Sequence, residues 1–396
     1  MIKLKLSLFF IGFFLTLTSF AAQVIGRLDV VDPTAGCQGW GLDPDNPNAT
    51  IQIHFYANAP AGTNGSVFIG STIANLSRPD VNATTGYPGN HGFLWQMPLS
   101  LTTPCQILIY AYGIDVTGNP NALLSSSPQL MPLLTKTISS PAGGSQIQIK
   151  ASSQYGGAIH SLIWNGKEFI NTADHGRELQ SASSFYNYAN SWTAECYNPT
   201  EAGSSNDGNS SCTSSKLLNF TNNNNQLYTK TKMAFYAHPG TNTGTSSCPT
   251  PLNTTVLSDH IFEKTVSIGI PGIPHAFKYL VTYTIPQNET YLGVGQFETV
   301  TGYLKNELNT FYQYDEITKQ LVLTSNTTSM EYVRPVVIST ADGLYAMGVY
   351  TPQIADDPID GQGYGLFPFP SASTYKWNVV RRIPNITPGS TYTFYS

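Results

Sequence analysis

Short segments in which apolar and polar residues alternate recur along the whole chain. Such alternation gives an extended strand one apolar and one polar face. The clearest examples are residues 51–56, 106–112, 146–150 and 278–284. Clusters of Gly, Pro, Asn and Asp separate these segments, and no window has the i, i+3, i+4, i+7 apolar spacing of a confident helix. The pattern therefore predicts an all-β fold.

A stretch rich in Pro, Ser and Gly interrupts the pattern between Asn119 and Gly144. Such composition is typical of a boundary between domains. We expect an immunoglobulin-like β-sandwich over residues 23–130, because about 100 residues suit about seven short strands. A linker over residues 131–144 and a larger β-sandwich over residues 145–396 would follow.

The first residues of the chain resemble an export signal. Lys3 and Lys5 precede the apolar run from Leu6 to Leu17, and a small-residue site ends at Ala21. This order predicts a cleavable signal peptide over residues 1–21 and a secreted protein, extracellular or periplasmic in transit. The apolar run is shorter than the roughly 20 residues that cross a bilayer, so we expect no membrane span.

Charge composition and the lack of certain motifs argue against several classes of function. Charged residues make up only 11% of the chain and the formal net charge is -5. Without a basic patch the chain is not expected to bind nucleic acid. The seven histidines are scattered without an H-E-x-x-H motif, and no G-x-S-x-G elbow of serine hydrolases occurs. We therefore expect no metal, no cofactor and a monomer.

The five cysteines favour disulfides, because the chain is predicted to enter an oxidising compartment. Cys37 and Cys105 bracket the strands of the first block, so we predict that they pair. Cys196, Cys212 and Cys248 are three and cannot all pair with one another.

The densest polar motif is Asn171-Thr-Ala-Asp-His-Gly-Arg-Glu-Leu-Gln180. If this segment is extended, Asp174, Glu178 and Gln180 face one way while His175 and Arg177 face the other. Four ionisable residues so close together in a chain poor in charge indicate either a ligand site or a buried salt-bridge network.

Four motifs follow one another in the first block, residues 23–130. They are Gly26-Arg-Leu-Asp29, Cys37-Gln-Gly-Trp-Gly-Leu-Asp43, Ser77-Arg-Pro-Asp-Val81 and His91-Gly-Phe-Leu-Trp-Gln-Met-Pro98. The series resembles a small β-sandwich repeat found beside catalytic or surface domains in exported bacterial proteins. From the residues alone, Trp40 and Trp95 are interpreted as core anchors, and Arg78 with Asp80 as an ion pair that fixes a loop.

The second block carries Gly156-Gly-Ala-Ile-His160, the polar motif above, Gln296-Phe-Glu-Thr-Val-Thr-Gly-Tyr303 and Tyr375-Lys-Trp-Asn-Val-Val-Arg-Arg382. In this order they resemble the β-supersandwich of the galactose mutarotase-like superfamily. The resemblance implies a saccharide on a concave sheet face, with His and Arg donating to hydroxyls, aromatic rings stacking on the sugar and a carboxylate moving a proton. The implied reactions are carbohydrate epimerisation, elimination or glycoside hydrolysis.

The resemblance also assigns roles to particular residues. It implies that His175 and Arg177 are donors, that Glu201 or Glu298 is the carboxylate, and that Tyr303, Trp377 and Asn378 form the floor, with core packing as the alternative for Trp377. A glycosidase would need two carboxylates, which Glu178 and Glu298 could supply. We therefore expect catalytic roles for Glu298, His175 and Glu178, and ligand contacts for Arg177, Gln180, Asn198, Glu201, Tyr303, Trp377 and Asn378. The first hypothesis is thus a secreted carbohydrate-binding or carbohydrate-active protein whose partner is a saccharide or a cell-surface glycoconjugate. The alternative is a non-enzymatic surface or host-interaction protein, an effector or adhesin that uses the sandwiches as recognition scaffolds.

Overall fold

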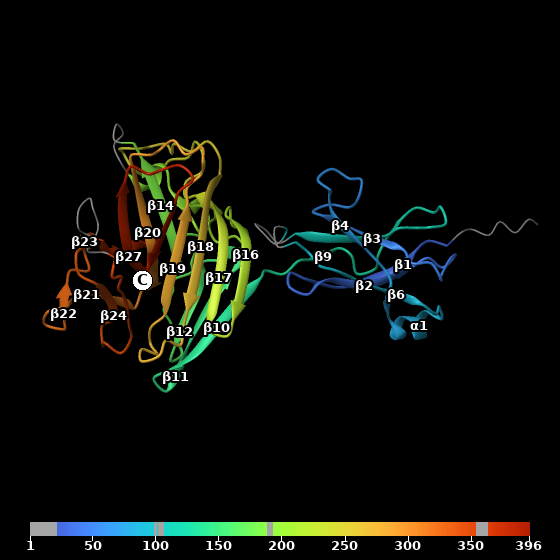
Figure 1. Ribbon diagram of the computed structural model, residues 1–396, viewed down its shortest axis with the longest axis horizontal. Coiled ribbons are helices and arrows are strands. Elements are labelled where there is room, and N and C mark those ends of the chain that lie inside the picture. Colours follow the sequence, from blue (N-terminus) through green and yellow to red (C-terminus); the bar gives the residue numbers. More distant parts are fainter. Residues whose placement is uncertain (1–21, 99–100, 102–106, 188–192, 354–362) are drawn as a thin grey trace, which may run out of the picture. The chain divides into compact units, whose positions relative to one another are not determined.

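The computed structural model describes residues 22–98, 101, 107–187, 193–353 and 363–396. This part of the chain is almost entirely β-structured, as the alternating pattern predicts (Figure 1). The predicted leader lies outside the described residues. Contacts divide the chain into two compact units, with a division between Gln129 and Leu130. Asp32–Ala35 and the described residues between 96 and 107 group with the second unit.

Two small sheets and one short helix form the N-terminal unit. The first sheet has the order β1, β2, β6, β5, with bounds Ile25–Asp32, Gly36–Leu42, Asn90–Trp95 and Leu76–Ser77. The second has the order β4, β3, β7, β8, with bounds Val67–Ile73, Gln52–Ala57, Leu108–Gly113 and Ala122–Leu123, and β9 (Gln129–Leu130) pairs with β7. Helix α1 (Pro79–Thr85) lies between β5 and β6 in sequence.

The ion pair predicted from the sequence is confirmed in this unit, whereas Trp40 and Trp95, interpreted as core anchors, are only half-buried. Arg78 donates to Asp80 at 2.7 Å and to Asp29 at 2.8 Å, so it is an ion-paired residue that ties the start of α1 to β1. Trp95 stacks on Phe55 with ring centroids 4.6 Å apart and an interplanar angle of 12°. This contact places its indole in the packing between the sheets.

The predicted bond between Cys37 and Cys105 is contradicted at Cys37, which is a buried free thiol. The alternation of β2 turns its side chain into the core of the unit, and burial raises the pKa of the thiol to about 12. Cys105 lies outside the described residues. A disulfide does join Cys196 to Cys248 in the C-terminal unit, with Cα atoms 5.9 Å apart.

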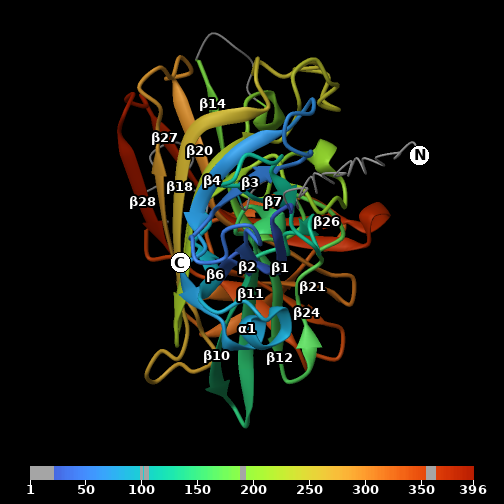
Figure 2. The ribbon, with the colours of Figure 1, turned by 90° about the vertical axis from the view of Figure 1, so that its right-hand side faces the viewer.

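The C-terminal unit is built on one large antiparallel sheet (Figures 1 and 2). Its path runs β23, β26, β27, β20, β14, β15, β17, β18, β19, β28, with bounds Met330–Tyr332, Tyr364–Phe369, Thr374–Pro384, Val294–Lys305, Leu179–Tyr186, Pro199–Thr200, Gln226–Phe235, Leu257–Ser267, Lys278–Thr284 and Thr391–Tyr395. Branches from this path are β10 (Thr135–Ala142), β11 (Ser145–Ser152), β12 (Ile159–Trp164), β13 (Lys167–Glu168) and β16 (Lys216–Asn223). A second sheet has the order β22, β21, β24, β25, with bounds Gln320–Thr324, Leu308–Asp315, Val336–Thr340 and Ala346–Val349.

The expected linker over residues 131–144 is wrong for most of its length. Strand β10 occupies residues 135–142 and pairs with β11 along its whole length. Gly143 and Gly144 both have positive φ, at 56° and 78°, so they form the tight turn between these strands rather than a flexible connection. The hairpin lies at one end of the unit beside β12 in both views (Figures 1 and 2).

Alternation along β27 gives the large sheet two chemically different faces. Lys376 and Asn378 point to one side, whereas Trp377 and Val379 are buried in the hydrophobic core on the other side. The same core contains Phe185, Phe262, Phe297 and Phe311 from neighbouring strands. Within the described residues no helix is both long and apolar enough to cross a membrane.

Candidate functional site

A polar cavity of about 630 Å³ lies over the face of the large sheet that carries Lys376 and Asn378. Strands β14, β20, β26 and β27 form its floor. Seven of the predicted site residues line it: His175, Arg177, Gln180, Asn198, Glu298, Tyr303 and Asn378. The sequence therefore identified much of this wall, although it missed Lys376, Arg382, Glu331, Phe367 and Phe369.

A β-bulge in β20 brings Glu298 and Tyr303 to the same cavity. The two residues are five positions apart, and a regular strand would turn them to opposite faces. The pairing with β27 shifts register between Glu298 and Val300, so the extra residue resets the alternation. As a result Glu298 and Tyr303 line the polar cavity, whereas Val300 faces the core.

Lys376 is the central charged residue of the cavity. Its Nζ lies 3.0 Å from a carboxylate oxygen of Glu298 and 5.2 Å from the ring centroids of both Tyr303 and Phe367. Burial lowers the pKa of Lys376, but Glu298 and Tyr303 raise it more strongly, so the net shift is upward. The ammonium group therefore stays charged at neutral pH and lies in contact with Glu298.

Two further ion pairs stand in the cavity wall. Arg177 binds both carboxylate oxygens of Asp174, at 2.9 and 2.6 Å, and donates to the backbone oxygen of Ala372 at 2.9 Å. Arg382 donates to Gln296 at 2.8 Å and to Glu331 at 2.7 Å. Paired in this way, the guanidinium groups are rigid donors whose orientation is fixed before any ligand arrives.

Asn378 supplies a buried acceptor without a partner. Its side chain is 1% exposed, and its Oδ1 has no hydrogen-bond partner among the described residues. Gly365 on β26 pairs with Asn378, and a Cβ at Gly365 would lie 2.3 Å from that oxygen. Because Gly365 has no side chain, there is room for the amide group of Asn378. A buried polar atom left unpaired is costly, so it marks a place where a ligand can donate.

An aromatic surface borders the same wall. Phe369 is 38% exposed and its ring stacks on that of Tyr303, with centroids 6.3 Å apart and an interplanar angle of 25°. An exposed ring that a second ring holds in place offers a flat apolar face next to the donors and acceptors.

His175 lies at the cavity, but its polar atoms are engaged elsewhere. Residues 173–178 form a turn, so the two faces of an extended segment do not arise there. Gly176 has a φ of 118°, and Arg177 donates to Asp174 across the turn. Nδ1 of His175 contacts the backbone oxygen of Ala202 at 3.0 Å, and Nε2 contacts that of Ser210 at 2.8 Å. The ring therefore fastens neighbouring loops and has no nitrogen free for proton transfer in this arrangement.

The structure places three of the predicted site residues outside the polar cavity. Glu201 is fully buried and forms an ion pair with Lys264, which also donates to the backbone oxygen of Gly157 at 2.8 Å. Trp377 is 1% exposed and faces the opposite side of β27. Glu178 is fully buried beneath the turn, where one carboxylate oxygen accepts from Gly176 N at 2.9 Å.

Glu178 is held in an environment that disfavours its charge. Burial raises its pKa well above the ordinary value of 4.5, the carboxylates of Asp174 and Glu201 raise it further, and the hydrogen bond from Gly176 opposes them. Its other oxygen, Oε1, has no partner among the described residues. Burial therefore favours the neutral form of this carboxyl group.

Replacing Glu178 by glutamine should increase stability at neutral pH and flatten its pH dependence. The folded-state pKa is raised, so the stability linked to this proton is complete below pH 4.5 and is lost as the pH rises through the folded-state pKa. The loss for one group is at most about 1.4 kcal/mol per pH unit, and glutamine cannot ionise. Urea unfolding between pH 4 and 8 measures the difference, with the exposed Glu316→Gln as control. If the free energies of unfolding of Glu178→Gln and of the parent change in parallel with pH, the pKa of Glu178 is not raised in the folded state.

The balance of charge restricts what the cavity can bind. Its lining contains four carboxylates and three basic side chains, namely Asp174, Glu195, Glu298, Glu331, Arg177, Lys376 and Arg382. A site for phosphate or sulfate would carry an excess of positive charge. Among the described residues no group of three or more His, Cys, Asp or Glu side chains is placed to hold a metal ion. The arrangement suits an uncharged ligand with many donors and acceptors.

Comparison with known proteins gives little further information. No protein-family model and no curated protein matches the chain. Among solved structures, the chain is similar to the Slr1438 protein of Synechocystis sp. PCC 6803, with a TM-score of 0.31 and 8% sequence identity over 66% of this chain and 93% of that one.

Proposed function

We propose that this protein binds a neutral saccharide in the polar cavity of its C-terminal unit and that it does so after export. The composition of the cavity wall supports the proposal. Ionic donors and acceptors are paired in the wall, a buried amide oxygen has no partner in the described part of the chain, and an exposed aromatic ring lies beside them. Sugars present hydroxyl groups around their edge and apolar C–H faces, which match these features.

Each element of the wall has a defined part in this proposal. Lys376 donates to sugar hydroxyls, while Glu298 and the Oδ1 of Asn378 accept from them. Phe369 packs against a face of the ring. The three ion pairs keep the polar groups in position, so little conformational entropy is lost when the sugar binds.

The geometry supports binding better than catalysis. General acid–base chemistry needs a proton donor and an acceptor that both reach the substrate. Of the three residues with predicted catalytic roles, His175 has both nitrogens at backbone oxygens, Glu178 is buried beneath the turn, and Glu298 is held by Lys376. The proposed activity is therefore recognition without turnover.

A glycan array followed by calorimetry tests this proposal. The array identifies the best neutral glycan, and titration then compares the parent with Phe369→Ala. We expect about ten-fold weaker binding, because stacking on an aromatic ring is worth about 1 kcal/mol or more. Since Phe369 is partly exposed, the melting temperature should stay nearly unchanged.

A matched control is Phe68→Ala, which removes a partly exposed phenylalanine from the N-terminal unit. It should leave binding intact. Asn378→Ala provides a second variant in the cavity and should weaken binding by a similar factor. Absence of any neutral glycan above background, or undiminished affinity in both cavity variants, would contradict the proposal.

A further inference from the structure

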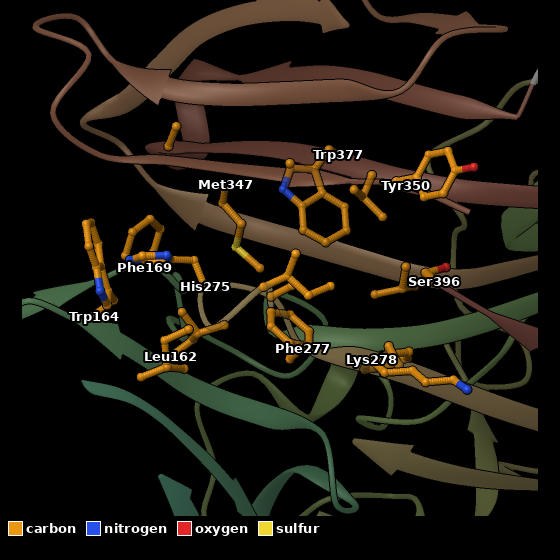
Figure 3. Close-up of a pocket in the computed structure, with 18 of the residues that line it drawn as sticks. Leu162, Trp164, Phe169, His275, Phe277, Lys278, Met347, Tyr350, Trp377 and Ser396 are labelled. Atoms are coloured by element: carbon orange, nitrogen blue, oxygen red, sulfur yellow. The ribbon is translucent and has the colours of Figure 1, made fainter. Parts of the chain in front are cut away.

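A second cavity, of about 740 Å³, lies on the opposite side of β27 from the polar one. It is lined mainly by apolar and aromatic residues of β12, β25, β27 and the segment 270–277, among them Leu162, Phe277, Met347 and Trp377 (Figure 3). Its volume falls within the roughly 300–1,000 Å³ of small-molecule sites. Protein interiors seldom leave apolar space of this size unfilled, so the cavity is a candidate binding site.

The walls of this cavity leave apolar surface accessible to a ligand. Ile273 is 55% exposed and Leu344 is 69% exposed, and both belong to the lining. Met347 and Trp377 extend into the same space, with the indole directed toward Phe277 (Figure 3). An alkyl chain in this space would remove apolar surface from water along its whole length.

The polar groups of the cavity are unevenly placed. Lys278 lies at one end with Tyr350 and Ser396, while Trp164 and Phe169 lie at the other (Figure 3). The Lys278 ammonium lies 5.4 Å from the ring centroid of Tyr395 at that end. Among the lining residues that the structure describes, none is Asp or Glu. The end that holds Lys278 therefore favours an anionic head group, with the apolar chain extending inward.

A buried donor inside the cavity supports ligand binding independently. Trp377 is 1% exposed, and its Nε1 has no hydrogen-bond partner among the described residues. Buried indole N–H groups usually find an acceptor. Of the groups of a fatty acid only the carboxylate accepts a hydrogen bond, so this N–H marks a polar point in the cavity wall and does not determine where the alkyl chain lies.

We infer that this cavity binds a long-chain fatty acid, with its carboxylate at Lys278 and its alkyl chain between Leu162, Phe277, Met347 and Trp377. This site is separate from the polar cavity, because adjacent residues of β27 point into the two spaces. Its occupancy does not depend on the proposed saccharide function.

Titration of the purified protein with decanoate, dodecanoate and tetradecanoate, below their micelle concentrations, tests the inference. Each additional methylene should tighten binding about four-fold, as expected for a methylene moved from water into an apolar space. Tryptophan fluorescence reports the event because Trp377 lies in the wall. Affinity that does not change with chain length would overturn the inference.

Variants assign the binding to this cavity. Met347→Trp should weaken binding at least ten-fold by filling the space, and Phe277→Glu should do so by placing a carboxylate within it. Two variants guard against failure of either one to fold, which circular dichroism would reveal. Undiminished binding in a folded variant would show that the fatty acid sits elsewhere.

A comparison of a fatty acid with the matching alcohol tests whether the carboxylate lies at Lys278. Lys278→Ala should weaken tetradecanoate several-fold while leaving tetradecanol unchanged, and Lys319→Ala, which removes an exposed lysine of the β21–β22 turn, should affect neither. Equal loss for acid and alcohol, or no loss for either, would overturn the placement of the carboxylate. Phe369→Ala, in the polar cavity, should leave fatty-acid binding intact even if saccharide binding is lost or never found.

Discussion

Replacing Lys264 by methionine should destabilise the C-terminal unit by about 3–5 kcal/mol, the usual cost of leaving one partner of a buried ion pair alone. Lys264 and Glu201 are both fully buried, so the substitution leaves the Glu201 carboxylate in the core without the ammonium group that faces it. Gly157 also loses the donor to its backbone oxygen. Urea unfolding of the full chain, followed by tryptophan fluorescence, measures the loss.

Two companion variants make this result interpretable. Lys232→Met breaks an exposed pair with Asp259 on β17 and β18 and should cost less than about 1 kcal/mol. The double variant Lys264→Met/Glu201→Gln removes the uncompensated charge and should recover much of the lost stability. If Lys264→Met proves no more harmful than Lys232→Met, the buried pair is not a determinant of this fold.

Replacing both Cys196 and Cys248 by alanine should destabilise the C-terminal unit by up to about 4 kcal/mol. The bond closes a loop with a sequence separation of 52, and the entropy that such a loop restores to the unfolded chain corresponds to about that free energy. It also anchors the short helix η3 (Ala194–Cys196), whose Glu195 lines the polar cavity. Thermal unfolding by calorimetry, with and without the substitutions, measures the effect.

Cys37→Ala is the control for this prediction, because it removes a buried cysteine that forms no disulfide. The loss should be confined to the small cavity left by one sulfur atom. Equal destabilisation by Cys37→Ala and by the double substitution would mean that packing, and not the covalent link, accounts for the change.

The regular strands could be predicted from the sequence because they depend on local alternation. Strand β19 has the bounds Lys278–Thr284 that the pattern predicts. The turn Asn165-Gly166 joins β12 to β13 with positive φ at both residues, as the Asn-Gly pair predicts. These features are determined by residues a few positions apart, which a single sequence displays.

The same alternation also identifies one error in the predicted site. Trp377 and Asn378 are neighbours on a strand, so they point to opposite faces and cannot both line one cavity. Lys376, which the sequence prediction missed, lies on the same face as Asn378. Alternation applied across the motif would therefore have selected Lys376 in place of Trp377.

Other parts of the site depend on contacts that local patterns do not reveal. The bulge after Glu298 that aligns it with Tyr303 arises from pairing with β27, about 80 residues further along the chain. The partner of Glu201 is 63 residues away, and nothing near Lys264 in the sequence distinguishes it from a surface lysine. Glu201 was predicted to contact a ligand, but it is buried and paired with Lys264. A carboxylate paired with a lysine in the core is not available to a ligand.

The alternation along β27 also limits which insertions and deletions the strand can accept. Its consecutive residues Lys376, Trp377 and Asn378 belong alternately to a polar and an apolar space. Insertion or deletion of one codon within this strand would turn the lysine toward the apolar cavity and the indole toward the polar one. Point substitutions can modify either cavity by itself, whereas changes of length disturb both. The length of this one strand therefore affects both cavities at once.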